Sequence, residues 1–109
     1  MNLLPYITRE GTKSTLKMPC DLTAVTAPEL RPELKNVIID GVRDLVLDMT
    51  QVHVVDSAGI GLLVAVYNSL ARLNGTLSVV NLSGELLKLF KAFRLDRHFS
   101  ISGTGEEEA

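Results

Sequence analysis

The sequence contains one cysteine, no tryptophan and few aromatic residues of any kind, 5% of 109. Because Cys20 cannot form an intrachain disulfide, a reducing compartment is favoured and we expect a cytoplasmic protein. The scarcity of aromatic rings argues against stacking platforms for single-stranded nucleic acid. Basic residues are not in excess either, since eleven Lys and Arg face thirteen Asp and Glu, for a formal net charge of −2. Nucleic-acid affinity comes mainly from a basic surface, so we expect no nucleic-acid partner.

Long hydrophobic runs are also missing. The longest apolar stretch, 58–67, has about ten residues, roughly half of what spans a bilayer. The segment 1–8 has no basic region followed by a long apolar one, and Pro5 interrupts it. We therefore expect neither an export signal nor membrane insertion.

The remaining composition is that of a globular protein, with 46% hydrophobic and 22% charged residues. A chain of this length forms one domain that needs no disulfide or metal to support its core. We expect that domain over residues 1–102. Residues 103–109 contain three glutamates and are expected to form a flexible acidic tail.

Hydrophobic periodicity predicts alternating strands and helices. Strands are expected at Leu3–Thr8, Ser14–Met18, Leu45–Leu47, Leu77–Val80 and, with less support, Phe99–Ile101. Helices are expected from a capping box at Thr26–Glu29 to Gly41, from Ser57 to Asn74 with Gly75 as its stop, and after Ser83. Pro32 is expected to distort the first of them.

This order predicts an α/β fold, because strand–helix–strand units make right-handed crossovers between parallel strands. We expect a mixed sheet of about four to five strands with parallel central strands and three or more helices. The unbroken apolar run Leu45–Leu47 indicates a strand covered on both faces. The predicted buried face of the second helix carries Ile60, Leu63, Val64, Tyr67, Leu70 and Ala71, and that of the third carries Leu86, Leu89, Phe90 and Phe93. The core is expected to include Leu47, Leu63, Val64, Val79 and Leu89.

Sites in such sheets lie beyond the carboxyl ends of the strands, which draws attention to Asp56–Gly61. Three interpretations of Ser57 stay open. It can be an ordinary N-cap beside two glycines that pack closely. The segment can cradle a ligand phosphate, although Val64 stands where a third glycine is needed. Finally, Ser57 can itself be phosphorylated at a helix terminus that tolerates the charge.

A hydrolase would need a nucleophile elbow, with glycine two residues before the serine, but Val55 stands there. The histidines are His53 and His98, and His98 lies in a charged run with Asp96. The roles of a catalytic triad are not filled, so we expect no enzyme, no catalytic residues and no metal site.

The run Val55–Gly61 resembles the Asp-Ser-Ser/Thr/Ala-Gly-Leu/Ile-Gly segment of STAS domains, the anti-sigma-factor antagonists of bacteria. The resemblance covers nearly the whole chain, including the initial hairpin, the strand near Leu45 and the last helix. It implies a small STAS-like domain without a cofactor that acts in transcription regulation.

What the resemblance implies about function is a phosphorylatable switch. In its unphosphorylated form such a protein binds a serine-kinase anti-sigma factor of the GHKL type, and a sigma factor is released. The kinase phosphorylates the serine after the motif aspartate, here Ser57, and a phosphatase reverses the reaction. The implied partner-binding residues are Asp21, Thr23, Asp56, Ser57, Ala58, Gly59, Ile60 and Gly61. We also expect the protein to form a weak homodimer.

The chain departs from the family pattern in Cys20–Thr23, where many members carry Gly-Glu-Leu-Asp. Thr23 can accept a hydrogen bond but supplies no carboxylate. Asp21 can keep an acidic role or bond nearby backbone, and Asp56 can orient Ser57 or simply stabilise the start of the helix. The alternative function is a STAS-like scaffold subunit of a transport or sensor assembly without serine phosphorylation.

Overall fold

The computed structural model describes residues 7–105, which form five strands, three α-helices and one 3₁₀ turn. In chain order they are β1 (Ile7–Glu10), β2 (Lys13–Lys17), α1 (Ala27–Ile39), β3 (Asp44–Asp48), α2 (Ser57–Ala71), β4 (Thr76–Leu82), α3 (Gly84–Ala92), η1 (Leu95–Arg97) and β5 (Ser100–Gly103). The first expected strand, Leu3–Thr8, lies largely outside the described residues, and only its last two residues fall within β1. Within the described residues, no helix is both long enough and apolar enough to cross a membrane.

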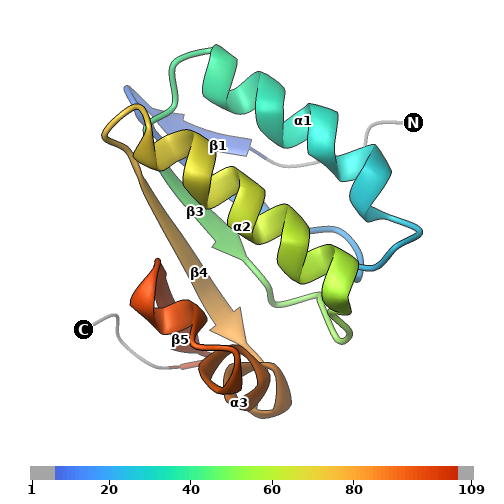
Figure 1. Ribbon diagram of the computed structural model, residues 1–109. Coiled ribbons are helices and arrows are strands. Elements are labelled where there is room, and N and C mark those ends of the chain that lie inside the picture. Colours follow the sequence, from blue (N-terminus) through green and yellow to red (C-terminus); the bar gives the residue numbers. More distant parts are fainter. Residues whose placement is uncertain (1–6, 106–109) are drawn as a thin grey trace.

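The strands form one mixed sheet in the order β1-β2-β3-β4-β5 (Figure 1). β1 and β2 are an antiparallel hairpin, whereas β2, β3, β4 and β5 are successively parallel. β3 lies in the centre, with Leu45 opposite Ser14 on one side and Leu77 on the other. The expected α/β fold with parallel central strands is confirmed.

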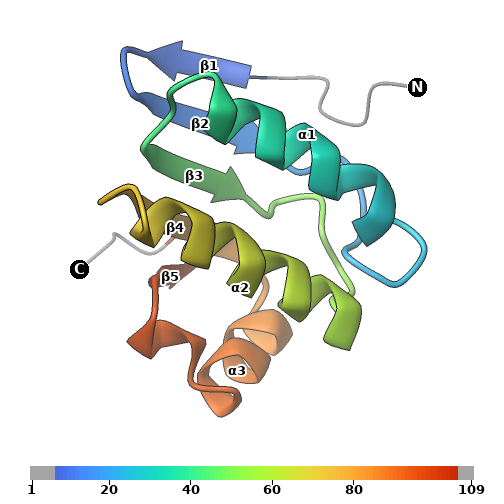
Figure 2. The same cartoon turned by 45° about the horizontal axis from the view of Figure 1, so that its top comes forward.

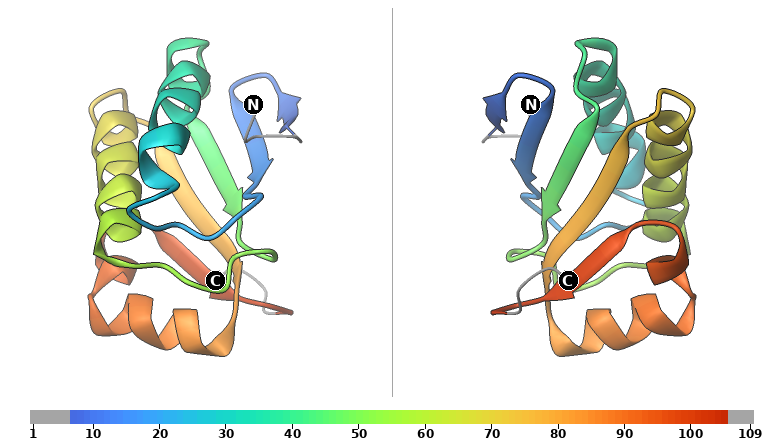
Figure 3. Two further views of the ribbon diagram at one scale, coloured as in Figure 1. Left: turned by 90° about the vertical axis from the view of Figure 1, so that its right-hand side faces the viewer. Right: turned by 90° about the vertical axis from the view of Figure 1, so that its left-hand side faces the viewer.

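Helices α1 and α2 lie side by side on one face of the sheet, and α3 lies toward its β5 end (Figures 2 and 3). Burial along β3 alternates: Leu45 and Leu47 are buried, whereas Val46 is half-buried. The expectation that this strand is covered on both faces is therefore wrong. Val46 extends the apolar run although its side chain points away from the helices, because successive side chains of a strand alternate between faces.

The core forms between the sheet and the helices, and Leu47, Leu63 and Val79 are buried in it as expected. Val64 and Leu89 are only half-buried and pack against its edge. The buried stripe of α2 is rotated from the predicted one, and consists of Gly59, Leu62, Leu63, Val66 and Leu70. α2 is apolar almost all round, so its periodicity could not fix which side faces inward. In α3, Leu86 and Phe90 are buried, whereas Phe93 is 58% exposed.

The helix ends correct two local expectations. Thr26 precedes α1 but makes no side-chain cap, because its hydroxyl donates to the carbonyl of Asp21 and accepts from the N–H of Thr23. Helix α1 continues through Pro32 to Ile39. After α2 it is Asn74 that takes the left-handed φ of 60°, while Gly75 is needed for space, since a Cβ there would lie 2.3 Å from the Arg43 carbonyl oxygen.

The last strand extends one residue past the expected end of the domain. Gly103 belongs to β5 and is buried, so the tail does not begin there. The N–H of Thr104 also donates to the carbonyl of Leu82 at 3.0 Å. Residues 106–109 of the expected tail lie outside the described residues.

Leu63→Ala tests this core. Leu63 is fully buried, so we expect the free energy of unfolding to fall by about 2–5 kcal/mol. Leu73→Ala is the matched control. Leu73 is 45% exposed, so its removal should lower the free energy of unfolding much less. Urea melts of both variants measure the difference, and equal losses would show that α2 is oriented differently.

Candidate functional site

Two loops meet beyond the carboxyl ends of β2 and β3. The first runs from β2 to α1 and the second, residues 49–56, runs from β3 to α2. Leu22 and Val55 form an isolated parallel bridge between them. The N–H of Leu22 donates to the Val54 carbonyl at 3.0 Å, and the N–H of Asp56 donates to the Leu22 carbonyl at 3.1 Å. We refer to this pairing of 21–24 with 53–56 as the loop contact.

Two carboxylates stabilise the loop contact, one from each loop. Oδ1 of Asp21 accepts from the N–H groups of His53 at 2.8 Å and Val54 at 3.2 Å. Oδ2 of Asp56 accepts from the N–H of Ala24 at 3.0 Å, while its Oδ1 accepts from Gly59 in α2, also at 3.0 Å. Each loop thus supplies one aspartate that binds the backbone of the other, and Asp56 also caps α2.

These hydrogen bonds favour the charged form of Asp56. The N–H groups of Gly59 and Ala24 hold the pKa of the Asp56 carboxyl below its ordinary value. A carboxylate at a helix N-terminus is further favoured by the helix dipole. The capping role that one interpretation gave to Ser57 therefore belongs to Asp56.

Ser57 is the first residue of α2, and it is exposed. Within the described residues its hydroxyl makes no hydrogen bond, because the N–H of Gly59 is already taken by Asp56. The fold therefore makes no use of the Ser57 hydroxyl. It stands at the surface, where another protein can reach it.

The two glycines of the motif differ in what surrounds them. A Cβ on Gly59 would lie 2.2 Å from the carbonyl oxygen of Leu22, so glycine is required for α2 to approach the first loop. Around Gly61 there is open space, with nothing within 4 Å of an added Cβ. The expectation of close packing at both glycines is therefore wrong for Gly61, which is exposed.

The other expected site residues are divided between the two loops and α2. Thr23 is half-buried, and its Oγ1 accepts from the N–H of Val25 at 3.2 Å, so it serves the turn of its own loop. Ala58 and Ile60 are half-buried against the core. The structure thus brings the first loop and the start of α2 together. Asp21 binds the backbone of the second loop, not the backbone of its own loop.

Sequence reasoning missed two apolar residues in these loops. Val25 is 80% exposed and Val54 is 51% exposed. Val54 is part of the loop contact, and Val25 follows Ala24 directly after it. Val55 faces inward at the bridge to Leu22, so alternation turns Val54 outward. The sequence has two adjacent valines here, and nothing in it showed that the loop is extended or which valine faces outward.

Metal ligands are not gathered at this site among the residues that the structure describes. In the part of the chain that the structure describes, no three His, Cys, Asp or Glu side chains are placed to hold a metal ion. His98 packs on the Tyr67 ring at 5.7 Å between centroids, and Tyr67 lies about 15 Å along α2 from Ser57. Burial raises the pKa of the Cys20 thiol, with the charges of Asp21 and Glu29 acting in the same direction, so this thiol stays protonated.

Alanine at the two glycines should give opposite results. Gly59→Ala should lower the free energy of unfolding by about 1–3 kcal/mol or more, because the methyl group meets backbone that cannot move aside cheaply. Gly61→Ala should raise it by about 0.5–1 kcal/mol, the ordinary gain of alanine inside a helix. Denaturant melts of the pair test the loop contact, and a harmless Gly59→Ala would contradict it.

The lowered pKa of Asp56 gives a pH dependence of known sign. The stabilisation from the charged carboxylate is complete above the ordinary Asp pKa of about 4 and is lost as pH falls through the lower folded-state value. Asn is an equally good cap but does not titrate in this range. The stability difference between wild type and Asp56→Asn should therefore shrink in urea melts from pH 7 to pH 3. A difference that does not change with pH would refute this.

Comparison with known proteins agrees with this geometry. Residues 6–108 match the STAS domain family. The chain is 30% identical over 91 residues to an anti-sigma-B factor antagonist of Staphylococcus aureus, covering 84% of each protein.

Two solved structures show a similar fold. An anti-sigma factor antagonist from Mycobacterium paratuberculosis has a TM-score of 0.79 at 25% identity, over 92% of this chain and 85% of that one. The Bacillus cell fate determinant SpoIIAA in its phosphorylated form has a TM-score of 0.69 at 16% identity, over 88% of each chain. With its mixed sheet, helices α1 and α2 on one face and a family match over nearly all its length, the chain belongs to the STAS domain family and is similar to its anti-sigma factor antagonists.

Proposed function

We propose that the protein is a non-enzymatic switch that binds a serine-kinase anti-sigma factor of the GHKL type and is controlled by phosphorylation of Ser57. The observation that carries this proposal is the exposed Ser57 hydroxyl, which the fold leaves unused because Asp56 caps α2. The relatives named as anti-sigma factor antagonists support the partner class. A solved neighbour in a phosphorylated form supports the modification.

The docking surface we propose comprises the loop contact and the first turns of α2. It contains Asp21, Thr23, Asp56, Ser57, Ala58, Gly59, Ile60 and Gly61. To these we add Val25 and Val54, whose exposed apolar side chains would lose contact with water in a protein interface. Gly61 has open space above it, so a partner backbone can approach α2 closely there.

Phosphorylation acts in this proposal through charge alone. A phosphate on Ser57 adds about −1.5 to −2 charges at a helix N-terminus, where the helix dipole and N–H groups tolerate an anion. The domain therefore stays folded. A partner shaped for a hydroxyl must instead desolvate a dianion next to Asp56, and binding is weakened. A phosphatase restores the binding form, and sigma-factor release follows from partner binding in the cytoplasm.

One observation favours the alternative, a scaffold subunit that is not phosphorylated. Many family members have a carboxylate where this chain has Thr23, and the Thr23 hydroxyl is engaged with the N–H of Val25 inside its own loop. A kinase contact that needs an acid at that position has no substitute there. Phosphorylation of Ser57 in the host decides between the two, by intact mass with and without phosphatase treatment.

Substitutions at Ser57 test the switch directly. Ser57→Asp should fold like wild type and bind its cognate kinase more than a hundredfold more weakly, which corresponds to a loss of about 3 kcal/mol. Ser57→Ala should bind normally and resist phosphorylation, and serves as the matched control. Calorimetry measures the affinities and thermal melts check the fold. Wild-type binding by Ser57→Asp, with no labelling of Ser57 by the kinase, would favour the scaffold function.

A further inference from the structure

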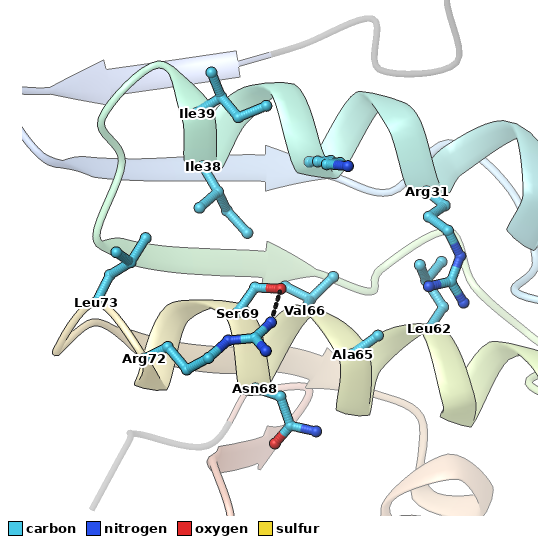
Figure 4. Close-up of a pocket in the computed structure, with 11 residues that line it drawn as sticks. Arg31, Ile38, Ile39, Leu62, Ala65, Val66, Asn68, Ser69, Arg72 and Leu73 are labelled. Atoms are coloured by element: carbon cyan, nitrogen blue, oxygen red, sulfur yellow. Dashed lines mark hydrogen bonds between the residues drawn. The ribbon is translucent and has the colours of Figure 1, made fainter.

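A groove of about 750 Å³ runs between α1 and α2, away from the loop contact (Figure 4). Its floor is apolar and comes from both helices, with Ile38, Leu62 and Val66 buried at its base. Ile39 and Leu73 stand at one end of it and are 68% and 45% exposed. An exposed apolar groove rimmed by polar residues is typical of a protein interaction site.

The charged residues of this groove all have one sign. Arg31, Lys35 and Arg72 line it, and no acidic residue is among its lining. The chain as a whole carries a net charge of −2, so this concentration of positive charge is local. The acids Glu29 and Glu33 of α1 lie outside the lining. The groove therefore combines an apolar floor with a basic rim.

The shape of the groove suits a helix. Between Leu62 and Ser69 it follows α2 for about 10 Å, which is two turns of an α-helix, and Arg72 and Leu73 extend it past the end of that helix. Ala65 and Ser69 contribute short side chains on this side of α2, so a third helix can come close. An amphipathic helix binds such grooves through apolar residues at i, i+4 and i+7.

We propose that this groove docks an amphipathic helix of a partner protein whose apolar face is bordered by Asp or Glu. Apolar burial against Ile39 and Leu73 supplies most of the affinity, and the basic rim orients the helix and speeds its association. The surface is separate from Ser57, so the proposal does not rest on phosphorylation and goes beyond the switch described above.

The test uses the full-length chain labelled with ¹⁵N and two synthetic peptides of about 15 residues, both helical with Leu at i, i+4 and i+7. One carries Glu beside the leucines and the other carries Lys. We expect the Glu peptide to shift the amide signals of Ile39, Leu62, Ser69 and Leu73. The Lys peptide should bind more than about tenfold more weakly, because the rim is basic.

Variants assign the binding to the groove. Two double variants should each weaken binding of the Glu peptide by about tenfold or more: Arg31→Glu with Arg72→Glu, and Ile39→Ser with Leu73→Ser. The thermal melts of both should stay close to wild type. Lys88→Glu with Lys91→Glu changes the charge equally on exposed residues of α3 and should have no such effect. These readouts need no kinase, so their failure leaves the Ser57 proposal standing.

Three outcomes would overturn the proposal. One is no amide shift at millimolar Glu peptide, and another is a shift that maps elsewhere or survives both double variants. The third is a dimer in analytical ultracentrifugation that Ile39→Ser with Leu73→Ser abolishes, since a second copy of the chain would then be the occupant.

Discussion

The approach of α2 to the Leu22 carbonyl determines where everything at this edge of the sheet lies. Gly59 permits the approach, since any larger residue would place its Cβ 2.2 Å from the Leu22 oxygen. The Leu22–Val55 bridge then aligns the two loops, and Asp21 and Asp56 bind them from opposite sides. The geometry depends on several modest hydrogen bonds that share one contact, so weakening any of them loosens the others.

The division of labour between Asp56 and Ser57 follows from this arrangement. Both residues stand at the start of α2, where free N–H groups invite a capping oxygen. Asp56 takes the role because its two carboxylate oxygens reach both Gly59 and Ala24, which one hydroxyl could not do. The exposed Ser57 hydroxyl is therefore not needed to cap the helix.

Much of this could be predicted from the sequence, and the failures have physical causes. The order of strands and helices followed from periodicity, and the position of the site followed from where parallel strands end. The buried side of α2 could not be fixed because Ile60, Leu62 and Val64 are equally apolar. The Thr26 cap failed because its hydroxyl found the Asp21 carbonyl instead. Contacts across more than thirty residues, such as Asp56 with Ala24, leave no local pattern to recognise.

The cap at Asp56 also has a kinetic consequence. A regulatory site built from a melting helix or a moving loop responds no faster than that element rearranges, on a scale of microseconds to seconds. Here the first turn of α2 is fastened by a neighbour, so altering the adjacent hydroxyl requires no rearrangement of the backbone. In the proposed switch, the response time would be set by the enzymes that modify Ser57 and by partner dissociation, because no part of the fold would have to move.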